Sequence, residues 1–170
     1  MLLAPVVTLA GVLSYLDDGY RGMLQTIRVM RDLVRRYRVH PDIRRAATSV
    51  LFLTPEREGS TRARALYEWV RDHVRYVPDV LDVETLTTPD KVLQTLIGDC
   101  DDQATLLATL YESVGFPTRF VVAGYTEPGI YEHVFLQVLS SGVWFDADPT
   151  EHEAFGWSPP FPVSTFIEGV

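Results

Sequence analysis

The sequence predicts an α+β fold, with helices in the first half of the chain, one helix that begins with the only cysteine, and strands after it. Three observations support this prediction. Apolar residues recur at helical spacing in the first half of the chain. Residues 99–117 have the start, the apolar spacing and the end of one helix. Alternating strand patterns with a tight turn then occupy residues 118–149, and a histidine and two aspartates lie on them.

An N-terminal helical extension is predicted over residues 1–58, and a core with a Pro/aromatic tail over residues 59–170. A first helix is predicted from apolar residues spaced by three and four, which are Met23, Ile27, Met30, Val34 and Tyr37. Arginines occupy the other faces of this helix. Pro41 suits the first turn of a second helix. A third helix is expected over residues 60–76, an irregular connection over 77–90, and a short helix from Pro89 to Leu96.

The cysteine lies where a helix is expected to begin. Asp99 occupies the N-cap position, so Cys100 is the first helical residue. The stripe formed by Ala104, Leu107, Leu110, Tyr111 and Val114 continues this helix, and Gly115 and Pro117 end it. Backbone N–H groups and the helix dipole are expected to lower the pKa of the thiol, with the aspartate side chains pointing outward. The alternative is a small buried hydrophobic side chain.

A hairpin of residues 133–139 and 143–149 supplies a candidate base and its partner. If Ser140 and Ser141 form the turn, His133 pairs directly with Asp148. If the turn is Ser141-Gly142, Asp148 is the diagonal neighbour of His133, which is still within reach. Asp146 lies two positions further away in both registers. Asp148 is therefore the better candidate to orient the imidazole of His133, which would accept the Cys100 proton.

A family resemblance is carried by "GDCDDQATLLATLYESVGFPTRFVVAGY", "EHVFLQV" and "VWFDADPT". These segments resemble the core of the transglutaminase-like superfamily, the papain-like cysteine enzymes, in which a Gly-x-Cys opens a helix packed on an antiparallel sheet. "LYEWVRDHVRYV" resembles the helix that precedes the cysteine. The N-terminal "GYRGMLQTIRVMRDLVRRY" resembles small transglutaminase-like proteins of tailed bacteriophages and prophages.

The resemblance implies a catalytic triad of Cys100, His133 and Asp148 that works without a metal or organic cofactor. Animal transglutaminases have a tryptophan just after the cysteine, whereas this chain has Asp101. Hydrolysis is therefore expected rather than cross-linking. The leading hypothesis is a cysteine peptidase or amidase acting on a protein or peptide.

Two alternatives remain open from the sequence. The chain could be a phage virion or assembly protein that uses this fold as a binding module, with phage structural proteins as partners. Its apolar N-terminus, basic helix and "FGWSPPFPVSTF" tail would then be interfaces. A zinc site of Cys100, His133 and His152 together with an acidic residue has suitable ligand types but lacks the usual ligand spacing.

Charge and composition limit the classes of partner. The net charge of −8 argues against nucleic-acid binding. Seven arginines nevertheless lie between Arg28 and Arg45, and a solvated helix face is the simpler interpretation. A single cysteine excludes an internal disulfide, so a cytoplasmic or virion-associated location is expected. The apolar start "MLLAPVVTLAGVLSYL" has no charged leader and is too short to cross a bilayer, so it is expected to dock on the core or on a partner.

Overall fold

The computed structural model describes residues 19–78 and 85–170. The helices are α1 (Gly19–Tyr37), α2 (Pro41–Phe52), α3 (Gly59–His73), α4 (Pro89–Thr95) and α5 (Cys100–Ser113). The strands are β1 (Arg75–Tyr76), β2 (Ile97–Gly98), β3 (Thr118–Gly124), β4 (His133–Ser140), β5 (Val143–Ala147) and β6 (Ser164–Gly169). The predicted α+β class is confirmed.

The main sheet has the strand order β5-β4-β3-β6, with every neighbouring pair antiparallel. Strand β6 lies within the segment predicted as a Pro/aromatic tail, because the prolines before it hide the strand pattern of its sequence. Its side chains alternate between partly buried and exposed, which is the pattern of an edge strand with one face on the core. Phe166 packs on that core, and Glu168 forms an ion pair with Arg31 of α1.

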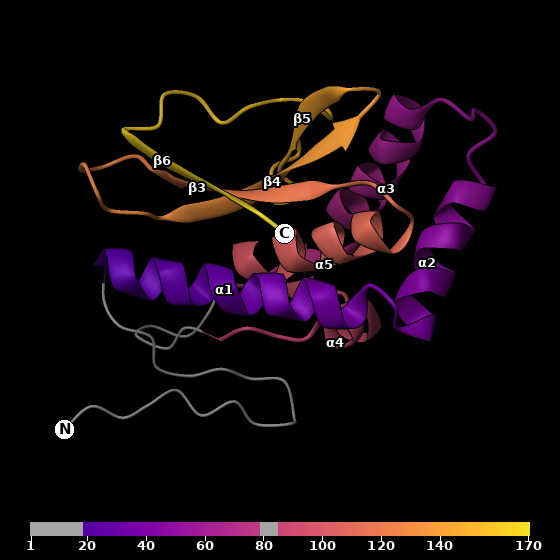
Figure 1. Cartoon of the computed structure of the whole chain (residues 1–170), viewed down its shortest axis with the longest axis horizontal. Coiled ribbons are helices and arrows are strands. Elements are labelled where there is room, and N and C mark those ends of the chain that lie inside the picture. Colours follow the sequence, from indigo (N-terminus) through magenta and orange to yellow (C-terminus); the bar gives the residue numbers. More distant parts are fainter. Residues whose placement is uncertain (1–18, 79–84) are drawn as a thin grey trace.

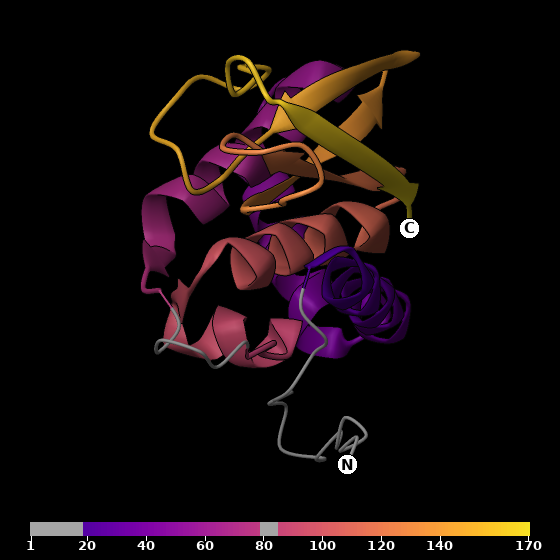
Figure 2. The same cartoon turned by 90° about the vertical axis from the view of Figure 1, so that its left-hand side faces the viewer.

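Helix α5 lies between the sheet and the pair α1 and α4, so the molecule has three layers (Figures 1 and 2). Every residue of α5 from Asp101 to Tyr111 is buried. The predicted apolar stripe is correct in its members, but the helix is enclosed on all sides rather than on one. The polar residues Thr105 and Thr109 are fully buried with it. A helix in the middle layer has no solvent face, which periodicity alone could not reveal.

The N-terminal helices join the same core as the sheet. Ile27, Met30 and Val34 of α1 are buried, as the spacing predicted, and they belong to one hydrophobic cluster with α5 and β4. Pro41 is at the start of α2, also as expected. Helix α3 ends at His73, earlier than predicted, because β1 follows and pairs in parallel with β2. The apolar segment 1–16 lies outside the described residues.

Strand β3 ends at a glycine that the packing requires. A Cβ atom on Gly124 would lie 1.7 Å from the carbonyl oxygen of Ile130. That separation is far inside van der Waals contact, so no other residue fits there without a backbone shift. This close approach fixes the loop that leads from β3 to His133.

Candidate active site

Cys100 is the first residue of α5, as the sequence predicted. Asp99 is the N-cap, and its carboxylate accepts a hydrogen bond from the backbone N–H of Asp102 at 3.1 Å. The preceding Gly98 belongs to β2, and a Cβ there would lie 2.6 Å from the Cβ of Asp102. The side-chain amide of Gln103 donates to the Gly98 carbonyl at 3.1 Å. The pairing of β2 with β1 and these contacts hold the segment that delivers the cysteine.

Asp101 and Asp102 do not point outward, so the expectation is wrong for these two acids, whereas Asp99 caps the helix as expected. Asp101 is 7% exposed and Asp102 is 5% exposed. Asp102 accepts a hydrogen bond from the backbone N–H of Thr87 at 2.7 Å. The Cys100 thiol donates to Asp101 at 3.5 Å. The segment that leads into α4 therefore contacts the first turn of α5 at Asp102, an acid that would face water on a surface helix.

The pKa of the Cys100 thiol is raised well above its ordinary value, contrary to the depressed pKa expected from a helix start. Burial is the largest cause, and the charges of Asp101 and Asp99 add to it. The backbone of Val134 on β4 opposes these effects by hydrogen bonding that favours the thiolate. These effects together favour the neutral thiol over the thiolate.

His133 and Asp148 are joined by a hydrogen bond of 2.6 Å between Nε2 and Oδ2. The strand register is the second of the two that the sequence left open, with Ser140 paired with Val143. Asp148 is 1% exposed on its side chain, and its other oxygen accepts from the backbone N–H and the hydroxyl of Thr150 at 3.2 and 2.7 Å. This carboxylate is thus fixed on both sides.

Asp146 has different partners, although it is only two residues away. It pairs with Gln137 across the hairpin and accepts a hydrogen bond from the Gln137 amide at 2.6 Å. Its other oxygen accepts from the Ser158 hydroxyl. Of the two acids on β5 and its end, only Asp148 contacts His133.

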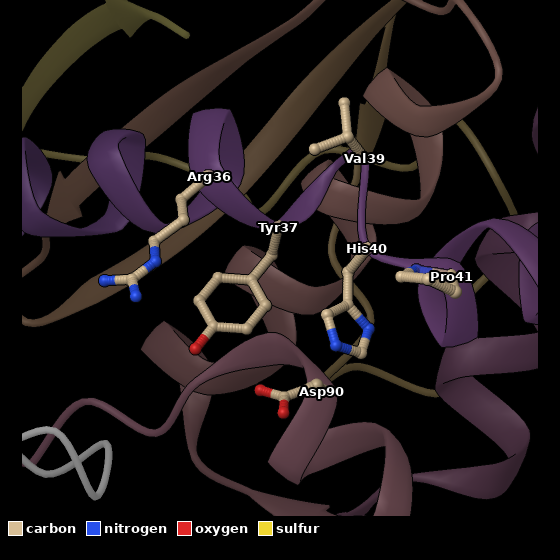
Figure 3. Close-up of a pocket in the computed structure, with 6 residues that line it drawn as sticks. All are labelled: Arg36, Tyr37, Val39, His40, Pro41 and Asp90. Carbon is tan, nitrogen blue, oxygen red and sulfur yellow. The ribbon is translucent and has the colours of Figure 1, made fainter.

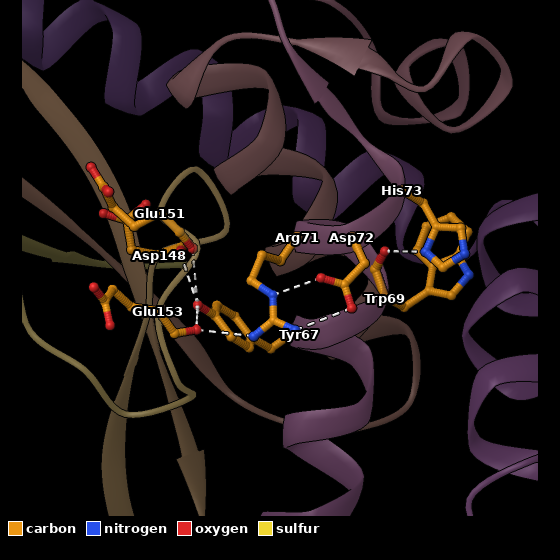
Figure 4. A network of polar contacts seen from close by, with 8 residues as sticks. All are labelled: Tyr67, Trp69, Arg71, Asp72, His73, Asp148, Glu151 and Glu153. Carbon is orange, nitrogen blue, oxygen red and sulfur yellow. Dashed lines mark hydrogen bonds and ion pairs between the residues drawn. The ribbon is translucent and has the colours of Figure 1, made fainter.

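Tyr67 of α3 holds the segment that carries Asp148, and the sequence analysis did not single it out. Its hydroxyl lies 3.2, 3.4 and 3.0 Å from the carbonyl oxygens of Asp148, Glu151 and Glu153 (Figure 4). The guanidinium of Arg71 lies over the Tyr67 ring and donates to the Glu153 carbonyl at 2.9 Å. The position of Tyr67 next to Leu66 and three residues before Val70 indicates a buried side chain. The sequence gives no signal for the carbonyl groups that its hydroxyl contacts.

Cys100 and His133 come from elements in contact, yet they are not hydrogen-bonded. Helix α5 packs on β4, and the backbone of Val134, the residue after His133, interacts with the thiol. None of the hydrogen bonds described for Cys100 involves His133. The His133 ring stacks on Phe135 with ring centroids 6.0 Å apart. Catalysis by this pair would need the thiol proton to pass from its contact with Asp101 to Nδ1 of His133, the ring nitrogen that does not contact Asp148.

The zinc alternative and a surface pocket remain to be compared with this site. Among residues 19–78 and 85–170, no group of three His, Cys, Asp or Glu side chains is arranged to hold a metal ion, and His152 is exposed. A pocket of about 360 Å³ is lined by Tyr37, His40, Asp90 and neighbours on α1 and α2 (Figure 3). None of its lining residues comes from β4, β5 or α5, so it is separate from the candidate active site.

The family assignment follows from a comparison with family models. The model of the transglutaminase-like superfamily matches residues 46–149, which include the cysteine, the histidine and the aspartate described above. The chain belongs to the transglutaminase-like superfamily. No curated protein sequence matches the chain significantly.

Solved structures share the fold of this transglutaminase-like chain. One is a "putative cysteine protease" from Cytophaga hutchinsonii, with a TM-score of 0.53 and 13% identity over 76% of this chain and 50% of that one. Another is a "putative protease" from Parabacteroides distasonis ATCC 8503, with a TM-score of 0.55 and 11% identity over 76% of this chain and 26% of that one. The chain thus spans half of the first protein and about a quarter of the second. No helix in the described part of the chain has the length and apolar character to cross a membrane.

Proposed function

We propose that this chain is a thiol hydrolase, a cysteine peptidase or amidase, with Cys100, His133 and Asp148 as its catalytic residues. The superfamily supports a cysteine-dependent enzyme, and the choice of hydrolysis and of these residues is our proposal. The observation that carries the proposal is the 2.6 Å hydrogen bond between His133 and the buried Asp148. His133 lies on β4, the strand that packs against the cysteine helix α5.

The hydrogen bond defines the role of each ring nitrogen. Because the Asp148 carboxylate only accepts, Nε2 of His133 is the donor and carries a proton. In the neutral ring Nδ1 is then the nitrogen with a free electron pair, so it is the one that removes the thiol proton. Asp148 holds this tautomer and stabilises the imidazolium that forms.

The proposed reaction proceeds in two balanced stages. The sulfur of Cys100 attacks the acyl carbonyl as its proton moves to Nδ1 of His133, and a tetrahedral intermediate forms. The same proton then passes to the leaving amine, and the thioester remains on the enzyme. Water attacks the thioester with His133 again taking a proton, which it returns to the sulfur as the acid leaves. The backbone N–H of Cys100, at the helix start, is a suitable donor to the oxyanion.

Acylation of the 170-residue chain by p-nitrophenyl acetate tests the proposal. Intact-mass spectrometry should find one acetyl group on Cys100, which is then lost by hydrolysis as p-nitrophenol release continues. Cys100→Ser should prevent this labelling, and His133→Ala should slow release by about 10²-fold or more. The exposed His152 supplies the control, because His152→Ala should behave like the wild type. Wild-type release that persists in Cys100→Ser would refute the proposal.

A second candidate is a binding module for virion assembly that does not use the thiol. Its support is a set of exposed apolar side chains, Phe52, Leu53 and Phe161, whose exposed fractions are 89%, 80% and 93%. The raised pKa of the Cys100 thiol, which disfavours the thiolate nucleophile, also supports it. The acylation experiment decides between the two, because a binding module would show no turnover that depends on Cys100 and His133.

A further inference from the structure

Asp101 is the side chain that the cysteine thiol contacts in this structure. The sulfur donates to its carboxylate at 3.5 Å, and Asp101 is 7% exposed. A charge that is removed from water acts on its neighbour with little screening, so this carboxylate influences the sulfur more strongly than a surface acid would. A carboxylate beside a sulfur disfavours a second negative charge there.

The position of Asp101 at the start of the helix stabilises the negative charge of its carboxylate. It is in the first turn of α5, where backbone N–H groups and the helix dipole stabilise an anion. The dipole that was expected to favour a thiolate at Cys100 therefore has carboxylates beside it in the same turn. Both acidic residues flanking the cysteine compete with the thiolate for the same positive end.

We propose that Asp101 is a positioning residue that holds the Cys100 thiol in its protonated and weakly reactive form when no substrate is bound. This inference rests on the proposed function for its purpose, but not for its test. The thiol proton lies toward Asp101 rather than toward His133, so the nucleophile is spared from adventitious electrophiles and oxidants. Reaction begins when the sulfur leaves this contact and its proton passes to Nδ1 of His133.

The matched control is Asp99, which flanks the cysteine on the other side. Asp99 carries the same charge, but its carboxylate is hydrogen-bonded to the Asp102 backbone as the helix N-cap. Asparagine caps a helix about as well as aspartate, so Asp99→Asn removes the charge and keeps the cap. Asp101→Asn likewise keeps size and an acceptor oxygen. The two variants therefore differ in which carboxylate loses its charge.

The experiment measures the rate of alkylation by iodoacetamide between pH 5 and pH 10 in the 170-residue chain, whose single cysteine makes the signal unambiguous. Asp101→Asn should shift the rising part of the pH profile toward lower pH by about one unit, which makes alkylation about tenfold faster at pH 7. Asp99→Asn should change the rate at pH 7 by no more than about threefold. Asp101→Glu, which restores the charge, should return the rate toward that of the wild type.

Two results would overturn the inference: an Asp101→Asn profile that coincides with the wild type, or an Asp99→Asn profile shifted equally. Circular dichroism and thermal melting check that each variant is folded, and Asp101→Ser serves if the asparagine variant is not. His133→Ala should leave the pH profile of alkylation in place while it slows p-nitrophenyl acetate turnover. A failure of the proposed function would appear in turnover alone, whereas a failure of this inference would appear in the alkylation profile.

Discussion

Replacing Asp148 with asparagine should invert the tautomer of His133. In the native chain one oxygen of Asp148 accepts from Nε2 of His133, and the other accepts two hydrogen bonds from Thr150. An asparagine keeps its single oxygen toward Thr150, because the NH₂ group cannot face two donors. The NH₂ group then faces Nε2, which must become an acceptor. The ring proton moves to Nδ1, and His133 loses the electron pair that would take the thiol proton.

The magnitude follows from the loss of the competent tautomer. A serine-type triad with this change loses about 10⁴-fold in kcat, so we expect about 10³- to 10⁴-fold here, or about 4–5.5 kcal/mol of transition-state stabilisation. Asp146→Asn is the matched control. Asp146 contacts Gln137 and Ser158 but not His133, so its change should alter kcat by about twofold at most.

Two assays separate the outcomes. The turnover of p-nitrophenyl acetate reports kcat, and the ¹⁵N chemical shifts of the His133 ring report the tautomer without any substrate. Asp148→Asn should move the proton from Nε2 to Nδ1, and Asp146→Asn should not. Equal losses of turnover in both variants, or an unchanged tautomer in Asp148→Asn, would refute the reasoning.

The remaining predictions concern stability. Tyr67→Phe removes a hydroxyl near three carbonyl oxygens and should lower the free energy of unfolding in urea by about 2 kcal/mol, whereas Tyr111→Phe, which loses one bond to a helical carbonyl, should cost about 1 kcal/mol. Burial raises the pKa of Tyr67 to about 12, above the unfolded value of about 10, so stability should fall as pH rises from about 10 to 12, and less steeply in Tyr67→Phe. If the melting temperature fell equally steeply with pH above about pH 10 in the wild type and in Tyr67→Phe, this prediction would be contradicted. Gly124→Ala should destabilise the fold by about 3 kcal/mol or prevent folding, because its Cβ would overlap the Ile130 carbonyl. Gly169→Ala should be nearly neutral, because no atom lies within 4 Å of the added Cβ. Similar melting temperatures of the two variants would show that the end of β3 relaxes to accept the side chain.

The sequence by itself determined the local features of the site. Capping chemistry placed Cys100 at a helix start, because an aspartate before an apolar repeat satisfies orphan N–H groups wherever the helix lies. Strand alternation and the Ser-Gly turn placed His133 and Asp148 on one hairpin, within a single step of register. These features depend on neighbours along the chain, which the sequence contains.

Only the tertiary structure decided what surrounds those residues. Helix α5 is enclosed by the sheet and by α1 and α4, so Asp101 is buried against the thiol, and the pKa of Cys100 is raised where local rules predicted a lowered one. The partners of Asp148 also came from afar, since Tyr67 is 81 residues away in the chain. Burial and long-range contacts depend on which elements meet in the fold. At Cys100 the loss of solvation affects the whole charge of the thiolate, so it raises the pKa by more than the partial charge of the helix dipole lowers it.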